Sequence, residues 1–156
     1  MYRFSLATLA LAATLVVPVA AQTPSKPVGP PRTIDIVAND EMKYSVTTIT
    51  AKPGEQLRVR LIARGVVPKI AMAHNFVLLK PGTNELKFVE AGAAFRDQDF
   101  VAPTMKASVL AKTTLAGPGE TVQVVFTAPA KPGSYSYLCT FSGHFQAGMR
   151  GVLIVK

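Results

Sequence analysis

The chain has 156 residues and a formal net charge of +8 at pH 7, with 17 Lys and Arg against 9 Asp and Glu. This length suits one domain, and an apolar content of 49% is enough for a single hydrophobic core. The basic residues are scattered, without a cluster or accompanying stacking aromatics, so a nucleic-acid-binding protein is not indicated. We expect the charge to serve solubility, with steering toward an acidic partner as the alternative.

The N-terminus has the three parts of a secretory signal peptide. A short charged segment precedes an apolar run over residues 4–17, and Val19-Ala20-Ala21 supplies small residues for cleavage. The apolar run is shorter than the ~20 residues that a membrane helix needs. The sequence therefore predicts a signal peptide over residues 1–21, a periplasmic location, and no membrane span in the mature form. An uncleaved N-terminal anchor is the alternative.

Cys139 is the only cysteine, so the chain cannot form an internal disulfide. An unpaired thiol in an oxidising compartment needs an explanation. A buried structural cysteine is one explanation. Metal ligation is the other, and we favour it because a bound thiolate is shielded from oxidation.

A Pro-rich stretch over residues 22–32 is typical of an extended linker, so the folded domain is expected over residues 33–156. Within that domain, short β-branched or alternating runs are separated by Pro-Gly turns, which is the pattern of strands. In the clearest run, Leu57, Val59 and Leu61 alternate with polar residues. Strands are expected at Thr33–Ala38, Tyr44–Thr50, Gln56–Ala63, Asn75–Leu79, Thr121–Thr127, Ser134–Cys139 and Gly151–Val155.

The strand pattern is lost between Thr83 and Leu115, where we expect a long excursion with a short helix around Glu90–Phe100. Many short strands at regular spacing favour two packed sheets. The predicted fold is all-β: a Greek-key β-sandwich of seven to eight strands with a flap or short helix inserted.

Cys139, His144 and Met149 fall at five-residue intervals, and His74 is the only other histidine. One thiolate, two imidazoles and one thioether make the ligand set of a blue-copper site. Taken singly, His74 is more often a core or surface histidine, and Met149 more often fills a core. Ligation is favoured because one known site type uses the only cysteine and both histidines. Since Cys139 ends one expected strand and Gly151 begins the next, His144 and Met149 fall on the connecting loop.

Three stretches resemble the azurin and auracyanin branch of the cupredoxins, the plastocyanin-like blue copper proteins. They are Asn39–Met42, Val67–Leu78 and Cys139–Gly151, within a resemblance that covers Thr33–Lys156. Four residues separate the second histidine from the methionine, as in auracyanins and rusticyanins, whereas azurins have three. Auracyanin-like is therefore the closer description.

The resemblance implies one type 1 copper per chain, bound equatorially by His74, Cys139 and His144. Met149 would be a long axial ligand, and the backbone carbonyl of Ala73, where azurins usually have Gly, would approach weakly from the opposite side.

The resemblance also implies contacts around this ligand set. Asn75 would hydrogen-bond to the Thr140 segment and clamp two ligand-bearing stretches together. The backbone amides of Asn75 and Phe141 would point at the Cys139 sulfur and tune the potential. His144 would be the ligand nearest the surface. An apolar rim around it is the expected docking surface for redox partners. Its members are Met42, Met72, Phe141, Gly143 and Phe145, of which Phe145 is the one most readily explained as core.

The predicted function is an exported single-electron carrier that shuttles electrons between periplasmic or membrane-bound redox proteins, such as c-type cytochromes or copper enzymes. Copper enzymes of this fold need further histidines, so we expect no enzyme. A periplasmic copper-storage or delivery protein is the alternative, disfavoured because such sites are usually exposed and rich in Met or His. A metal-free binding module would leave the coincidence of Cys, His and Met unexplained. We expect a monomer.

Overall fold

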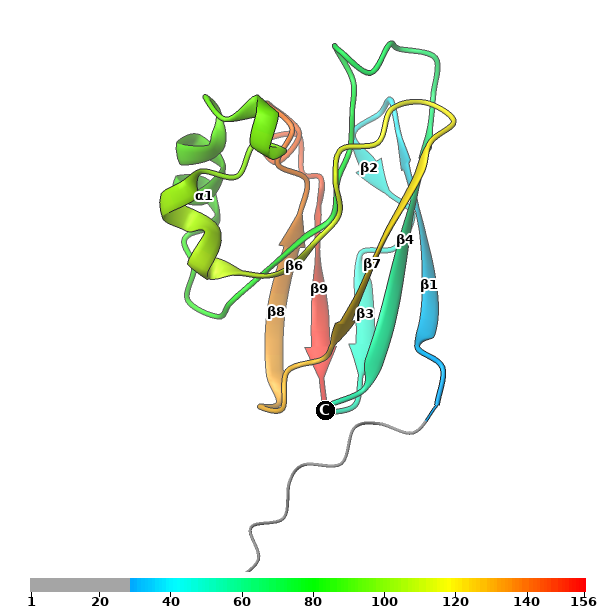
Figure 1. The fold of residues 1–156 in the computed structure, drawn as a ribbon, viewed down its shortest axis with the longest axis vertical. Coiled ribbons are helices and arrows are strands. Elements are labelled where there is room, and N and C mark those ends of the chain that lie inside the picture. The colour runs from blue at the N-terminus through cyan, green and yellow to red at the C-terminus, as the bar shows by residue number, and fades with distance from the viewer. Residues whose placement is uncertain (1–28) are drawn as a thin grey trace, which may run out of the picture.

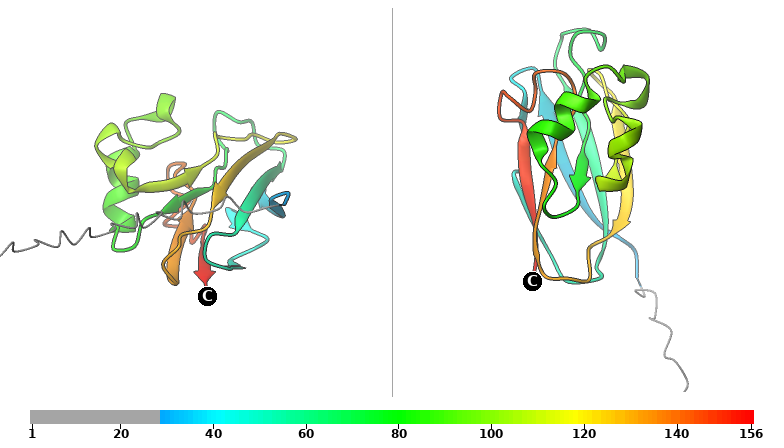
Figure 2. Two further views of the ribbon diagram at one scale, coloured as in Figure 1. Left: turned by 60° about the horizontal axis from the view of Figure 1, so that its bottom comes forward. Right: turned by 90° about the vertical axis from the view of Figure 1, so that its left-hand side faces the viewer.

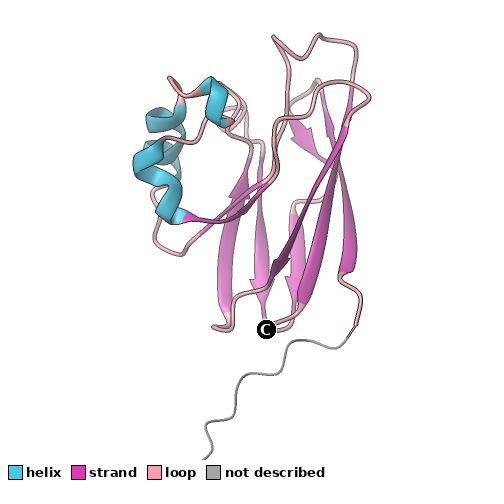
Figure 3. Cartoon of the chain, viewed as in Figure 1, coloured by secondary structure: helices cyan, strands magenta, loops and turns pink. Residues whose placement is uncertain are grey.

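A computed structural model of the protein describes residues 29–156. The predicted signal peptide and most of the predicted linker lie outside the described residues. Two β-sheets pack face to face, and a helical flap lies to one side of them (Figures 1 and 3). None of the described helices is long and apolar enough to cross a membrane.

The first sheet has the strand order β2-β1-β4-β7, with β1 parallel to β4 and the other pairs antiparallel. Its strands are β1 (Arg32–Asn39), β2 (Lys43–Tyr44), β4 (Gln56–Arg64) and β7 (Thr121–Thr127). In β4 the alternation of apolar and polar residues decides which face of the strand turns inward. Its apolar side chains Leu57, Val59 and Leu61 are fully buried between the sheets.

The second sheet has the order β3-β9-β8-β5-β6, with β3 parallel to β9. Its strands are β3 (Thr48–Ala51), β5 (Val77–Leu79), β6 (Val109–Lys112), β8 (Gly133–Leu138) and β9 (Arg150–Val155). On β8, Tyr135 and Tyr137 face the core on the same side as Cys139, which follows the strand. The described residues thus form a β-sandwich, as predicted.

The described residues contain nine strands, more than the seven to eight that were predicted, for two reasons. The stretch predicted as one strand, Tyr44–Thr50, divides between the two sheets. Ser45 donates its backbone N–H to the Val37 carbonyl at 2.9 Å and accepts the Val37 N–H on its hydroxyl at 2.8 Å, which completes the pairing with β1. The chain then crosses to pair with β9 as β3. Strand β6 lies inside the excursion where no strand was predicted.

The flap comprises α1 (Glu85–Gly92) and two 3₁₀ turns, η1 (Arg96–Gln98) and η2 (Pro103–Ser108). The helix predicted around Glu90–Phe100 therefore lies several residues too late. The helix begins earlier because the Asn84 side chain accepts a hydrogen bond from the Lys87 N–H at 3.0 Å, as an N-cap does. It ends at Gly92, where a Cβ would lie only 2.0 Å from the Phe100 carbonyl oxygen.

Two hydrophobic clusters support these layers. The larger lies between the sheets and includes Cys139 and Met149 near one end. The smaller lies under the flap, where Phe88 and Val89 of α1 pack against strands β5 and β8. Figure 2 shows the loop that follows β8 at the pole of the sandwich opposite the C-terminus and the start of β1.

Candidate metal centre

His74, Cys139 and His144 come together at this pole of the sandwich. One donor atom from each lies within 4.8 Å of the other two, and all three residues are buried. Cys139 directly follows β8, and His144 lies on the loop that leads to β9. His74 comes from a separate segment that pairs with Ala116 through a single antiparallel bridge.

The loop from Cys139 to Met149 is held by its own backbone hydrogen bonds. The Cys139 N–H donates to the Met149 carbonyl at 3.1 Å, and the Met149 N–H donates to the His144 carbonyl at 3.0 Å. Gly143 and Gly148 have φ angles of 84° and 88°, a left-handed conformation that glycine adopts without steric cost. The loop therefore places three predicted ligands with little conformational freedom.

The His74 ring offers a nitrogen suited to a metal. Its backbone is fixed by hydrogen bonds of 2.9 and 2.8 Å with Ala116, but its ring Nδ1 is buried and has no hydrogen-bond partner among the described residues. Leaving a buried polar atom unpaired costs about 1–3 kcal/mol. A metal ion at this nitrogen removes that cost, so the residues present fit a bound ion. The His74 and His144 ring centroids are 5.0 Å apart.

Burial sets the protonation of the three donors. It raises the pKa of Cys139 to about 12, against the smaller effect of hydrogen bonds from the Asn75 and Phe141 backbone. Burial, and secondly the neighbouring His74, lowers the pKa of His144 to about 4. Burial also lowers the pKa of His74, with Asp40 acting in the opposite direction. At neutral pH the imidazoles are thus neutral and able to ligate, and the thiol must release its proton to bind a metal.

The other two predicted ligands lie beside this group. Met149 is fully buried in the same core cluster as Cys139 and Ala73. The backbone carbonyl oxygen of Ala73 lies 4.0 Å from the Cys139 sulfur.

Asn75 joins the two segments that carry the donors. Its side-chain amide donates to the Thr140 hydroxyl at 2.8 Å, and its side-chain oxygen accepts the Thr140 N–H at 2.9 Å. The flap adds a third partner that the sequence analysis did not identify. The Asp99 backbone carbonyl accepts from the Thr140 hydroxyl at 2.6 Å and from the Asn75 amide at 3.2 Å. A backbone acceptor has no signature in the sequence, so no local pattern pointed to Asp99.

The predicted docking residues differ in exposure. Met42 and Met72 are half-buried and Gly143 is exposed. Phe141 is only 8% exposed, and its ring lies 4.8 Å from the His144 ring. His144, expected nearest the surface, is as enclosed as His74, at 2% against 1% exposure. Phe145 packs against the cluster under the flap, so it is partly a core residue.

Residues 33–156 match the family of copper-binding proteins described as the plastocyanin/azurin family. The chain belongs to this family. Membership confirms the predicted resemblance, and the cofactor is copper, one type 1 ion per chain.

Named relatives within the plastocyanin/azurin family include azurin from Pseudomonas aeruginosa, 36% identical over 126 residues that cover 79% of this chain and 84% of that protein. Auracyanin-A from Chloroflexus aurantiacus is 34% identical over 128 residues, 81% of this chain and 75% of that protein. Auracyanin-B from the same organism is 32% identical, and the chain spans only 53% of its length.

Solved structures in this family have the same architecture. Auracyanin A, a "blue" copper protein from C. aurantiacus, superposes with a TM-score of 0.72 at 32% identity, covering 81% of this chain and all of that one. An azurin from Methylomonas sp. strain J gives a TM-score of 0.70 at 32% identity, over 80% and 98% of the two chains. These likenesses confirm the predicted cupredoxin sandwich.

Proposed function

We propose that this chain is an exported single-electron carrier that shuttles electrons between periplasmic or membrane-bound redox proteins. The observation that carries the proposal is the enclosed group of one thiol and two imidazoles, with donor atoms within 4.8 Å of one another. The similarity of the chain to azurins and auracyanins supports the same function.

In this proposal His74, Cys139 and His144 are the strong copper ligands. Met149 is the weak axial ligand, and the Ala73 carbonyl makes a weaker contact. Copper supplies a centre that takes up and releases one electron, and a soft thiolate with borderline imidazoles suits both oxidation states.

The protein's own contribution is rigidity. The self-bonded loop and the hydrogen bonds between Asn75 and Thr140 hold donors from two separate segments in one arrangement. Little rearrangement is then needed when the charge of the site changes. Enclosure also excludes water and substrate, which favours a carrier over an enzyme and over a protein that releases its copper readily.

Electrons enter and leave, in this proposal, through the rim that surrounds His144. The rim comprises Met42, Met72, Phe141, Gly143 and Phe145. Its support is the contact of the Phe141 ring with the His144 ring, and the exposed backbone of Gly143 beside them.

The visible and EPR spectra after addition of one equivalent of Cu(II) test the proposal. We expect intense blue absorption from charge transfer between Cys139 and copper, with narrow copper hyperfine splitting. Cys139→Ser should lose the blue band while the sandwich stays folded by circular dichroism. A pale adduct with ordinary splitting in the unsubstituted protein would contradict thiolate ligation and favour copper carriage or a metal-free binding role.

A further inference from the structure

A loop at the metal pole presents apolar side chains to solvent. Val66 is 91% exposed and Ile70 is 70% exposed, the highest values among the large exposed hydrophobic residues of the described chain. Both lie between β4 and His74, on the loop that projects at the top of Figure 1. The loop is anchored at its base, because an Asp40 carboxylate oxygen accepts from the Val66 N–H at 2.8 Å and the Val67 N–H at 3.3 Å.

Arg96 of the flap lies between this loop and the metal centre. Its guanidinium donates a hydrogen bond to the Ile70 carbonyl. The guanidinium carbon also lies 5.8 Å from the centre of the Phe141 ring, within cation–π distance. Since the Phe141 ring is 4.8 Å from the His144 ring, the cation stands one aromatic ring away from a predicted copper ligand.

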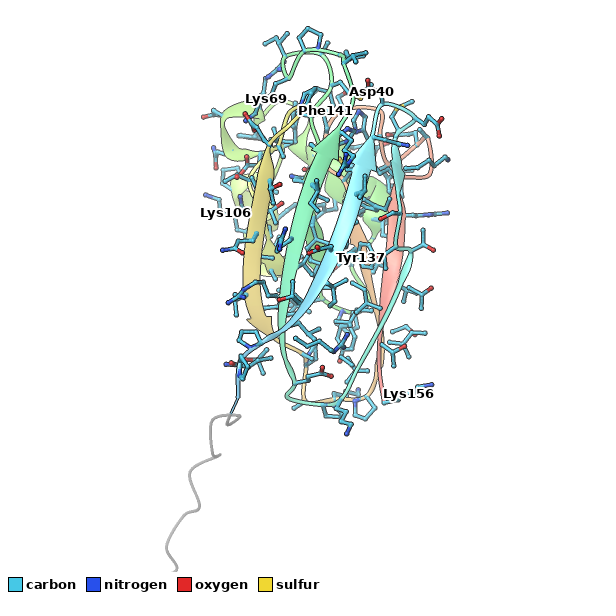
Figure 4. The ribbon with its side chains drawn as sticks, turned by 90° about the vertical axis from the view of Figure 1, so that its right-hand side faces the viewer. Asp40, Lys69, Lys106, Tyr137, Phe141 and Lys156 are labelled. Atoms are coloured by element: carbon cyan, nitrogen blue, oxygen red, sulfur yellow. The ribbon has the colours of Figure 1, made fainter. Side chains whose placement is uncertain are left out.

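The charge of Arg96 is not neutralised within the described residues, where no carboxylate lies within salt-bridge distance of it. Two other cations are paired with carboxylates, whereas the Lys43 ammonium at this pole donates to the Ala147 carbonyl at 3.0 Å. Lys69, labelled at the same end of the sandwich as Phe141 in Figure 4, pairs with Glu120 at 2.6 Å, and Arg150 pairs with Glu85 at 3.4 Å. An exposed cation beside solvent-facing apolar side chains is the composition of a protein-binding surface.

We propose that Val66, Ile70 and Arg96 form a docking surface for an acidic redox protein, with Arg96 pairing with a carboxylate of that partner. The inference rests on the electron-carrier function proposed above and extends its docking rim. Charge complementarity supports it, because the chain is strongly basic, with a formal net charge of +8 that includes Arg3 of the predicted signal peptide, and so steers acidic partners toward itself. A carboxylate at Arg96 would bring the partner alongside Phe141, next to His144.

Two small reductants of opposite charge test the role of Arg96. The copper-loaded, oxidised protein takes one electron from hexacyanoferrate(II) or from hexaammineruthenium(II). The reductant is thereby oxidised to hexacyanoferrate(III) or hexaammineruthenium(III). Arg96→Gln removes the charge, Arg96→Lys keeps it, and Lys131→Gln removes a charge from the exposed turn between β7 and β8 as the matched control. Stopped-flow loss of the blue band gives each second-order rate constant.

We expect Arg96→Gln to slow reduction by hexacyanoferrate(II) by about threefold or more at low ionic strength, and not to slow reduction by hexaammineruthenium(II). Arg96→Lys should retain most of the rate, and Lys131→Gln should have a clearly smaller effect than Arg96→Gln. Equal effects of the Arg96→Gln and Lys131→Gln substitutions, or equal losses in Arg96→Gln and Arg96→Lys, would overturn the inference. An absent blue band in the unsubstituted protein would refute the proposed function instead.

The apolar part is tested with acidic and basic c-type cytochromes as protein probes. Ile70→Ser and Val66→Ser should slow electron exchange with the acidic cytochrome and leave the reaction with hexacyanoferrate(II) unchanged. The proposed docking surface would be refuted if the unsubstituted protein exchanged electrons faster with the basic cytochrome than with the acidic one. It would also be refuted if both serine variants kept the unsubstituted rate with the acidic cytochrome.

Discussion

Enclosure governs the chemistry of the individual donor residues. Burial disfavours charge on Cys139, and the backbone N–H groups of Asn75 and Phe141 favour it. The same N–H groups would stabilise the thiolate that forms when the thiol loses its proton to a metal. The donors are therefore neutral before metal binding and supported by fixed dipoles afterwards.

Met149 provides a prediction at this scale. Met149→Leu should keep copper and raise the reduction potential, because the loss of a weak donor to Cu(II) disfavours the oxidised form. The expected rise is on the order of 60 mV, a tenfold change in the one-electron equilibrium. Cyclic voltammetry of the copper protein measures it.

Met105→Leu is the matched control, since Met105 is a half-buried methionine that packs under the flap, in the cluster separate from that of Cys139. Its potential should stay unchanged. An equal potential in the Met149→Leu variant and the unsubstituted protein would refute the axial role.

At the scale of elements, Asp99 connects the flap to the metal centre. Its backbone has a φ of 56°, and its carbonyl accepts from both members of the Asn75–Thr140 pair. Its carboxylate accepts from the Lys112 ammonium at 2.5 Å and from the Leu115 N–H at 3.1 Å. The flap is thus fastened to β6 and to both ligand-bearing segments through one residue.

Lys112→Met tests this connection. The substitution leaves the carboxylate of the Asp99 side chain, which is 20% exposed, without a paired cation. The free energy of unfolding should fall by about 1–2 kcal/mol, the usual cost of removing a charged hydrogen-bond partner at a partly buried site. Chemical denaturation of the metal-free protein measures the loss.

Lys69→Met removes the cation of a more exposed pair, whose side chains are 49% and 47% exposed. Its cost should stay below about 1 kcal/mol. If the two substitutions cost the same, the Asp99 connection would add no more than a surface ion pair does.

Prediction of the elements succeeded where the pattern was local. Strand β4 followed from the alternation of Leu57, Val59 and Leu61. The flap helix was placed too late because it begins at the N-cap Asn84, which the prediction did not use. The division of β2 from β3 depends on which sheet each segment pairs with. Such pairing is a choice between distant partners, and no short window of sequence contains it.

At the scale of the whole molecule, the core holds the two sheets together and the candidate metal centre lies at one pole. The segments that carry the proposed ligands are held by hydrogen bonds within the protein, so we expect the arrangement of these residues to form without copper. The metal-free protein should therefore be folded, and copper should add stability through binding to the native state alone.

Thermal unfolding followed by circular dichroism measures this effect. The metal-free protein should unfold cooperatively, and Cu(II) at about 1,000 times its dissociation constant should add about 4 kcal/mol. The Cys139→Ser variant should gain much less. A metal-free protein without strand signal would contradict a preformed site, as would equal gains in the two proteins.

The sequence by itself determined the chemistry of this protein, because residue types and close spacing are local properties. Cys139, His144 and Met149 lie within one short stretch, and with His74 they indicate copper without any knowledge of contacts. Only the tertiary structure decided how those donors are held and approached. The Asn75–Thr140 bonds join residues 65 positions apart, and Asp99 and Arg96 reach the site from a flap with no periodic pattern. Such contacts form when distant segments pack together, and the packing of the whole chain selects them.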